Sequence, residues 1–467
     1  MSARHRSVTA GVVVVAVGAV VLAGAMGTTG AVGASTVRPI SSSTPPAATV
    51  PVPDLPTAQN LTVLAPLNPA APVPSRAGLT AALAGPLASP ALGPTTAVAI
   101  YDAATGVQLL DQAASTPATP ASTNKLLTAA SVLTAVGADQ RVSTKVVRGS
   151  ASSELVLVGG GDPLLKIAEP KATEDADASL AHLAAEAAAA VKAAGSGVTQ
   201  PVSVRFDDAL FSGPTAVASW PPGFPMPPIT ALMADGGYRA SGQSDPSKSA
   251  AMAFAKLLGA NGVSVSKTVT RQAAAGGAAL IASVASRPVS ELVLHTLDLS
   301  DNVAAEVLAH LAGAKTGAGG SFSGGVDASL AVLRSLNIPT DSVTLVDGSG
   351  LSRSDQIPPT VLARLLSSVA RNANPQLWAV ASGTPIAGFT GTLANRFKTA
   401  AAAPGAGVVR AKTGTLSGVG ALAGLVPTKD GALLAFSMVA PNAKDVLVAE
   451  AQLDQAAAAL SSCGCRP

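Results

Sequence analysis

Three short motifs in this chain carry side chains that could act together as a nucleophile, a base and an anion-binding group. Ser122 and Lys125 are three positions apart, a spacing that puts both side chains on one face of a helix. A serine is a poor nucleophile until a neighbouring base takes its proton, and a lysine becomes such a base when its pKa is lowered. The pair alone decides little, because a helix-capping serine followed by a surface lysine gives the same pattern.

Two further motifs lie downstream of this pair. Ser300, Asp301 and Asn302 stand between two segments with helical spacing. A second hydroxyl there could relay a proton, and a carboxamide could hold a substrate amide. The alternative is a helix cap, which all three residue types favour. Lys412 and Thr413 end a strand-like segment, where an ammonium and a hydroxyl can bind a carboxylate.

Gly414 and Thr415 complete this last motif, and the glycine lets the backbone come close to a ligand. Its alternative interpretation is a charged strand end. The order of the motifs is more informative than any one of them. S-x-x-K at a helix start, then S-D-N, then K-T-G on a late strand is the set found in penicillin-binding proteins and class A β-lactamases.

Two other segments match single motifs outside the required context. Ser264 and Lys267 repeat S-x-x-K in an alternating run that predicts a strand, where positions i and i+3 face opposite sides. Lys315 begins a second K-T-G, which follows a helical segment and precedes a glycine cluster, as at a helix end. We therefore expect Lys412, not Lys315, to be the working lysine.

The hydrophobic pattern predicts the elements that must position these motifs. A helix is expected over 126–136, directly after Ser122, and a β-hairpin over 96–101 and 106–110, before it. Further strands are predicted at 155–158, 202–206, 408–412, 419–426 and 432–439, and further helices at 176–194, 247–258, 288–297, 303–311 and 443–460.

Several of these segments resemble one known family. Residues 120–128 (Pro-Ala-Ser-Thr-Asn-Lys-Leu-Leu-Thr) are similar to the active-site segment of the D-Ala-D-Ala carboxypeptidase/endopeptidase family of low-molecular-mass penicillin-binding proteins. The resemblance continues through 159–164, 300–306, 347–352 and 388–393, and covers about residues 96–439.

The resemblance implies an α/β (α+β) fold with a penicillin-recognising, transpeptidase-like core. An antiparallel sheet flanked by helices would be interrupted by inserted structure. We assign residues 78–140 and 287–462 to the catalytic domain, and residues 141–286 to one or more inserted domains. The insert is expected to shape the substrate site without forming a second active site, and Asp162, Asp207 and Asp208 to be turn or cap residues.

The family resemblance also implies roles for the motif residues. Ser122 would attack the carbonyl between two D-alanines, and Lys125 would accept its proton. Ser300 would relay a proton to the leaving amine, Asn302 would hold the peptide amide, and Lys412 would bind the terminal carboxylate.

The rest of the third motif is expected to help bind the substrate. Thr413 would share the carboxylate with Lys412, beside Gly414, and the backbone N–H groups of Ser122 and Thr415 would form the oxyanion hole. No metal or cofactor is implied, and the four histidines lack H-x-x-x-H spacing.

These features predict a serine D,D-peptidase that acts on peptidoglycan stem peptides as a carboxypeptidase, an endopeptidase or both. β-Lactams would be covalent inhibitors, because they copy the acyl-D-Ala-D-Ala end. Two alternatives remain open at this point: a β-lactamase-like hydrolase, and a non-catalytic scaffold that binds the cell wall.

The N-terminus has the pattern of an export signal. A basic start precedes an uncharged apolar run, so residues 1–35 predict a signal peptide or membrane anchor. Residues 36–77 are rich in Pro, Ala, Ser and Thr and predict an extended linker. The folded part would then be extracytoplasmic, with membrane contact only through an uncleaved N-terminus.

Composition and cysteines add two limits. The net charge is only +3, and no basic run with interleaved aromatics appears, so nucleic acid is not an expected partner. Cys463 and Cys465 are the only cysteines. In an exported protein they are expected to form disulfides, within the tail or between chains.

Overall fold

The computed structural model describes residues 67–170, 177–194, 200–237, 245–371 and 374–464, all of which belong to one compact unit. The predicted signal or anchor (1–35) and the linker up to residue 66 lie outside the described residues. Across the described ranges, no helix is both long and apolar enough to span a membrane. Helix α1 (Arg76–Leu87) begins just before the predicted end of the linker, because the Ser75 hydroxyl caps it by accepting from the Gly78 N–H.

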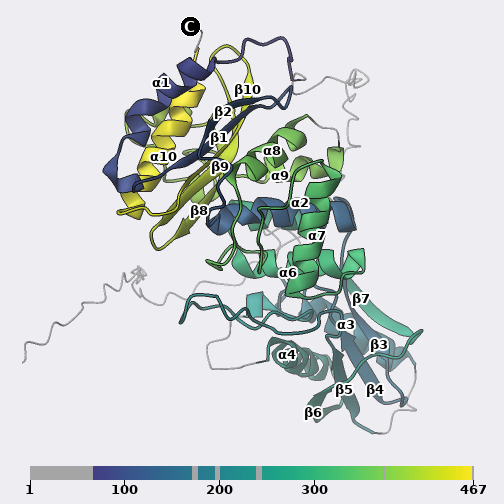
Figure 1. The fold of residues 1–467 in the computed structure, drawn as a ribbon. Coiled ribbons are helices and arrows are strands. Elements are labelled where there is room, and N and C mark those ends of the chain that lie inside the picture. The colour runs from purple at the N-terminus through teal and green to yellow at the C-terminus, as the bar shows by residue number, and fades with distance from the viewer. Residues whose placement is uncertain (1–66, 171–176, 195–199, 238–244, 372–373, 465–467) are drawn as a thin grey trace, which may run out of the picture. The chain divides into compact units, whose positions relative to one another are not determined.

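A five-stranded antiparallel sheet carries the K-T-G motif (Figure 1). It contains the predicted N-terminal hairpin, β1 (Ala97–Asp102) with β2 (Gln108–Gln112), and the three C-terminal strands. Its order is β2-β1-β10-β9-β8, so the first strand pairs with the last. The C-terminal strands are β8 (Arg410–Leu416), β9 (Val419–Pro427) and β10 (Leu433–Ala440).

Each face of this sheet is covered by helices, which confirms the predicted antiparallel sheet flanked by helices. On β1, Val98 and Ile100 belong to the core formed with α1 and α10 (Val446–Ser461). The alternate residues Ala99 and Tyr101 belong to the core formed with α2 (Lys125–Val136) and α8 (Pro359–Ala370). Successive strand side chains point to opposite faces, so a strand buried along its whole length serves both cores.

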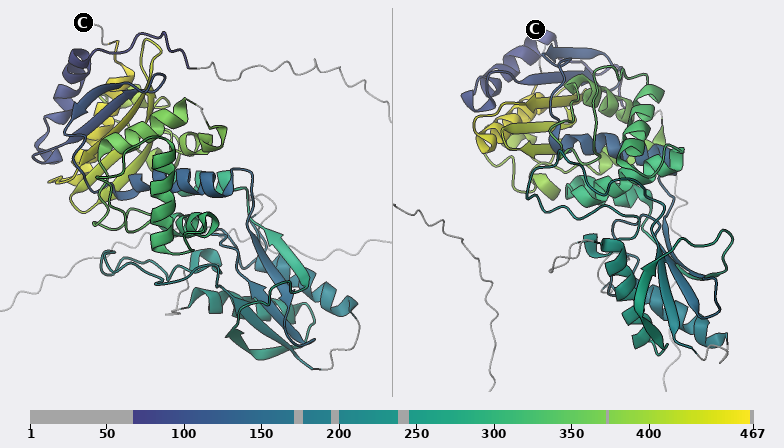
Figure 2. Two further views of the ribbon diagram at one scale, coloured as in Figure 1. Left: turned by 45° about the vertical axis from the view of Figure 1, so that its right-hand side comes forward. Right: turned by 60° about the horizontal axis from the view of Figure 1, so that its bottom comes forward.

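Further helices surround α2 and hold the S-D-N motif. The helix α6 begins at this motif and packs against α2 and α7. Figures 1 and 2 show α2, α6 and α7 between the two sheets of the compact unit. The helices of this group are α5 (Val289–Asp298), α6 (Asn302–Thr316), α7 (Phe322–Ser335) and α9 (Trp378–Ser382).

A second five-stranded sheet lies within the range that the sequence assigned to the insert. Its order is β6-β5-β4-β3-β7, with parallel β4–β5 and β5–β6 pairs and antiparallel β3–β4 and β3–β7 pairs. It has its own apolar core, shared with two helices. The elements are β3 (Ser143–Arg148), β4 (Glu154–Val158), β5 (Val202–Asp207), β6 (Val265–Arg271), β7 (Leu280–Ala285), α3 (Leu180–Ala193) and α4 (Pro246–Ala260).

The sequence pattern misplaced one motif and missed several elements. The K-T-G residues lie inside β8 rather than at its end, because β9 pairs with β8 through Leu416. Helices α7 and α8 and strands β3 and β7 were not predicted, although all four contribute to the two large cores.

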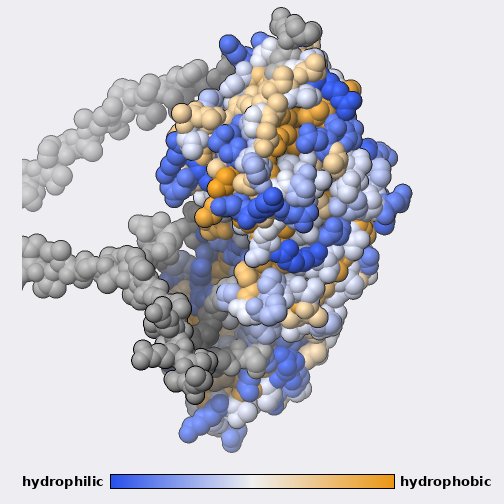
Figure 3. Space-filling model, turned by 60° about the vertical axis from the view of Figure 1, so that its left-hand side comes forward, coloured by the Kyte–Doolittle hydropathy of each residue, from blue (hydrophilic) through white to orange (hydrophobic). Residues whose placement is uncertain are grey.

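The exposed face in Figure 3 mixes hydrophobic and hydrophilic residues. The exposed large hydrophobic side chains include Leu447 and Val448 on α10 and Phe389 in the loop before β8. Apolar atoms make up much of any folded surface, so these residues carry no functional conclusion by themselves.

Candidate active site

Ser122 lies in a single 3-10 turn, Ala121–Asn124, that leads directly into α2. Ala121 has φ +47°, a left-handed conformation that is uncommon for a residue with a β-carbon. Gly350 packs directly against this turn, because a β-carbon at Gly350 would lie only 1.9 Å from the Ala121 carbonyl oxygen. The absence of a side chain at Gly350, far away in the sequence, therefore allows its loop to approach the turn that contains Ser122, the nucleophile turn.

Lys125 is fully buried and its amine reaches three oxygen atoms. Its Nζ lies 2.9 Å from Ser122 Oγ, 2.7 Å from Asn302 Oδ1 and 2.7 Å from the Ser349 carbonyl oxygen. Burial lowers the pKa of Lys125 from 10.5 to about 8, although nearby carboxylates, with Asp347 foremost, act in the opposite direction. The S-x-x-K spacing thus places a lysine with a lowered pKa beside the serine.

A second buried lysine faces the other side of the site. Lys412 Nζ lies 2.8 Å from Ser300 Oγ and 3.1 Å from the Thr413 carbonyl oxygen. Burial, and then the positive charge of Lys125, lower the pKa of Lys412 well below its ordinary value. Ser300 adopts φ +57°, which bends the chain just before α6. Asp301 caps that helix by accepting from the Ala304 N–H at 3.0 Å.

The other K-T-G residues continue along β8. Thr413 Oγ1 lies 3.0 Å from Thr392 Oγ1 and is nearly buried. Gly414 runs close to the nucleophile turn, since a β-carbon there would lie 2.7 Å from the Pro120 carbonyl oxygen. Thr415 is exposed, and its hydroxyl donates to Glu450 on α10. The strand therefore lies against the turn that presents Ser122.

Three buried carboxyl groups, Glu306, Asp347 and Asp355, surround the loop that contacts the Lys125 amine. Glu306 accepts from the N–H groups of Gly348 and Ser349 at 2.9 and 2.8 Å, which fixes the loop whose carbonyl receives the Lys125 amine. Burial and the charge of Asp347 raise the pKa of Glu306 and of Asp355 well above the ordinary range. Protons on these two groups leave less negative charge buried around Asp347.

Comparison of the sequence with models of known protein families identifies one family, and the site geometry agrees with it. The profile of the D-Ala-D-Ala carboxypeptidase 3 (S13) family matches residues 79–242 and 239–461. The chain belongs to this family. It is therefore a serine D,D-peptidase that acts on peptidoglycan, and its substrate lies outside the cytoplasm.

Several known proteins are similar to this chain over most of its length. Carboxypeptidase DacB of Mycolicibacterium smegmatis is 38% identical over 409 residues, which are 86% of this chain and 87% of the relative. The D-alanyl-D-alanine carboxypeptidase of Actinomadura sp. (strain R39) is 30% identical over 440 residues, 76% of this chain and 79% of the relative. The crystal structure of penicillin binding protein 4 from Haemophilus influenzae has the same fold, with a TM-score of 0.63 at 20% identity, covering 81% of this chain and 98% of that one.

The structure of this D,D-peptidase brings the predicted site residues of the three motifs into one region. Hydrogen bonds link Ser122, Lys125 and Asn302 in one group, and Ser300 and Lys412 in another. The remaining residues, Thr413, Gly414 and Thr415, follow Lys412 on the strand beside the nucleophile turn.

A loop of the predicted insert also reaches this region. Trp220 Nε1 donates to Asp347 Oδ2 at 2.8 Å, and the Ser219 and Ser352 hydroxyls lie 2.7 Å apart. Asp347 also accepts from the Gly350 and Ser352 N–H groups. The insert loop therefore bonds directly to the carboxylate that organises residues 347–352.

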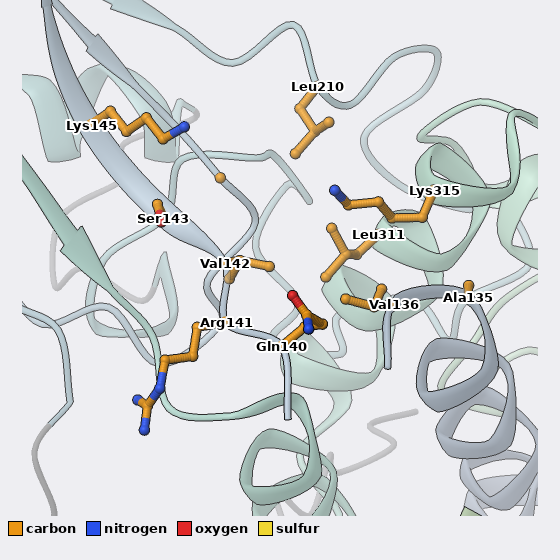
Figure 4. A pocket seen from close by; sticks show the side chains of 11 residues that line it. Ala135, Val136, Gln140, Arg141, Val142, Ser143, Lys145, Leu210, Leu311 and Lys315 are labelled. Carbon is orange, nitrogen blue, oxygen red and sulfur yellow. The ribbon is translucent and has the colours of Figure 1, made fainter. Parts of the chain in front are cut away.

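The second S-x-x-K match (Ser264 and Lys267) and the second K-T-G match (Lys315) lie away from the candidate active site. Strand β6 begins at Val265, as the alternating pattern predicts, and Lys267 is exposed on it. Lys315 is exposed in the last turn of α6. Figure 4 shows Lys315 and Lys145 pointing into a cavity of about 300 Å³ that none of the predicted site residues lines.

Sequence reasoning gave no role to two supporting residues, Glu306 and Asp347. Both lie within segments that resemble the family, yet a carboxylate in a loop or helix carries no signal of burial in the sequence alone. Only the fold shows that Glu306 lies beneath the Asp347–Ser352 loop. Cys463 is buried and disulfide-bonded, whereas Cys465 lies outside the described residues.

Proposed function

We propose that this D,D-peptidase works through an acyl-enzyme on Ser122, with Lys125 as the general base. The observation that carries the proposal is the set of three oxygen atoms around the Lys125 amine. A neutral amine has two N–H donors and one lone pair. Asn302 Oδ1 and the Ser349 carbonyl accept the two donors, which leaves the lone pair facing the Ser122 hydroxyl.

Acylation then follows from this arrangement. The Ser122 hydroxyl passes its proton to Lys125 as its oxygen attacks the carbonyl between the two terminal residues of the stem peptide. An ester bond forms and the peptide bond breaks. The proton taken from Ser122 is returned to the leaving amine, with Ser300, which is hydrogen-bonded to Lys412, as the proposed relay, so that Lys125 is neutral again. Water later attacks the ester, and the shortened peptide leaves with Ser122 restored.

Lys412 and Thr413 are proposed to bind the substrate carboxylate. An anion at this position would restore the positive charge on Lys412 that burial disfavours. The N–H groups of Ser122 and Thr415 are proposed as the oxyanion hole, since Gly414 brings β8 close to the nucleophile turn.

Mass spectrometry of the digested, penicillin-treated protein tests the nucleophile. We expect the mass of one penicillin on the peptide that contains Ser122, and no adduct in Ser122→Ala. A folded protein that is acylated on another peptide, or not at all, would contradict the proposal.

The balance between carboxypeptidase and endopeptidase activity is the second part of the proposal. The relatives named as carboxypeptidases support release of terminal D-alanine as the main reaction. Incubation with a defined pentapeptide and with a cross-linked dimer separates the two activities. Faster cleavage of the dimer would reverse the assignment.

Export is proposed from the N-terminal sequence. Residues 1–35 would direct the chain out of the cytoplasm, and the linker to residue 77 would precede the folded part. A reporter that works only in the cytoplasm, fused after residue 74, should be inactive. Full reporter activity would exclude export.

A further inference from the structure

A small polar cavity lies between α8 and the hairpin of β1 and β2, outside the catalytic residues. It has a volume of about 140 Å³. A single water molecule needs only about 10–15 Å³ of such space, so a larger polar group fits. Its polar lining consists of two arginines and four hydroxyl side chains: Arg364, Arg371, Tyr101, Thr105, Ser367 and Ser368.

Both arginines are held in place by neutral partners. Arg371 donates to Ser367 Oγ at 2.9 Å and to Ser368 Oγ at 3.1 Å. Its guanidinium occupies the space next to Gly106, where a β-carbon would lie 2.2 Å from Nη1. Arg364 donates to the Asn337 carbonyl oxygen at 2.8 Å. A guanidinium has five N–H donors, so each of these two arginines has further N–H groups that can bind a ligand.

Neither guanidinium is paired with a carboxylate in the part of the chain that the structure describes. Two carboxylates of the β1–β2 hairpin region already accept other hydrogen bonds. Asp102 accepts from the Ala104 N–H and the Thr105 hydroxyl, and Asp111 accepts from the Ala114 N–H. Two guanidinium groups thus share one small cavity, and neither forms an ion pair with the Asp102 or Asp111 carboxylates that lie behind its wall.

We propose that this cavity binds a phosphoryl group. Guanidinium groups match the geometry of phosphate oxygens bidentately, and the Tyr101 and Ser368 hydroxyls at the same site can donate as well. A phosphate monoester of a small metabolite and a phosphodiester of a cell-wall polymer present the same chemistry. The site belongs to neither the nucleophile turn nor β8, and it does not depend on the proposed acylation.

Thermal unfolding of the full chain, at constant ionic strength, tests the site. A ligand that binds only the folded state raises Tm in a saturable way. We expect such a rise with inorganic phosphate and not with chloride. In the double variant Arg364→Gln/Arg371→Gln, the Kd for phosphate should rise at least tenfold, because glutamine keeps a donor but loses the charge.

Two matched controls make the result specific. Arg334→Gln removes an exposed arginine outside the cavity, and Lys145→Gln/Lys315→Gln removes the two lysines of the 300 Å³ cavity. Both should keep the phosphate response. The penicillin acylation rate of the Arg364→Gln/Arg371→Gln variant should stay within twofold, which shows that it is folded.

Calorimetric titrations with glucose 1-phosphate and with a glycerol phosphodiester then identify the source. Tighter binding of the diester points to a wall polymer, and tighter binding of the monoester to a small metabolite. An unsaturable Tm rise, or a response that Arg364→Gln/Arg371→Gln retains or that the lysine variant loses, would overturn the proposal.

Discussion

The two sheets of this D,D-peptidase bury different kinds of residue around them. Beside the catalytic sheet, Lys125, Lys412, Glu306 and Asp355 are all at 0% exposure. Around the second sheet, most charges pair near the surface, as Arg271 does with Asp208 and Asp245. Burying ionisable groups is costly, so their concentration in one region points to a requirement other than stability.

The largest expected effect comes from the base. Lys125→Ala should lower penicillin acylation and D-alanine release by a factor on the order of 10²–10⁴, the usual contribution of a general base. Stopped-flow acylation measures it. Lys267→Ala, which removes the lysine of the decoy S-x-x-K, is the matched control and should be silent. Equal losses of acylation in Lys125→Ala and Lys267→Ala would contradict the assignment of catalysis to the region of the first sheet alone.

The two K-T-G lysines give the next test. Lys412→Ala should reduce D-alanine release by a factor of about 10² or more, because it removes the amine proposed to become charged when the substrate carboxylate binds. Lys315→Ala should change kcat/KM less than twofold, since that side chain is exposed. Steady-state kinetics with a pentapeptide measures both. The reverse result would move the substrate site away from β8.

The pH dependence of acylation sharpens the role of Lys125. Only the neutral amine accepts the Ser122 proton, and the pKa of Lys125 is lowered to about 8. The acylation rate should therefore rise with pH up to about 8 and level off above it. In Asp347→Asn the rising part of the pH–rate profile should move to lower pH, because the carboxylate that most favours the charged form of Lys125 is gone. An unchanged pH–rate profile in that variant would mean that Asp347 does not influence the pKa of Lys125.

The contact between the two regions predicts a moderate effect. Trp220→Phe keeps an aromatic ring but removes the hydrogen bond to Asp347. A hydrogen bond to a charged group contributes about 1.5–3 kcal/mol, and a part of this should appear as a loss of roughly fivefold or more in the acylation rate. Trp378→Phe, on the exposed side of α9, is the control. A silent Trp220→Phe would mean that the insert loop does not influence the base.

The smallest effect is expected within the second sheet. Asp207 accepts from the Ala209 and Ala274 N–H groups at 2.9 and 2.8 Å. Asp207→Ala should cost about 1 kcal/mol of unfolding free energy and leave acylation within twofold. Urea unfolding and the acylation assay measure the two quantities. Loss of acylation in a folded variant would show that the insert takes part in the chemistry.

Contacts between residues close in sequence at the site were predictable, whereas the long-range contacts that hold the site residues in place were not. The Ser122–Lys125 contact follows from one helical turn, and β8 follows from its apolar run. The bonds from Lys125 to Asn302 and Ser349 join segments that are far apart in the chain. Spacing cannot predict such contacts, because they depend on how α6 and the 347–352 loop pack. Likewise α8 covers the sheet, yet its apolar residues alone do not say which strand they meet.

The pairing of β1 with β10 has a consequence for the making of this protein. The strand that leads to the nucleophile turn can be completed only by a strand near the other end of the chain, and β8 and Gly350 also come late. Contacts this distant in sequence form slowly. A chain that emerges from its N-terminus first therefore carries Ser122 long before it carries the parts that activate it. The contacts around Ser122 are therefore complete only after β8 and β10 have been synthesised.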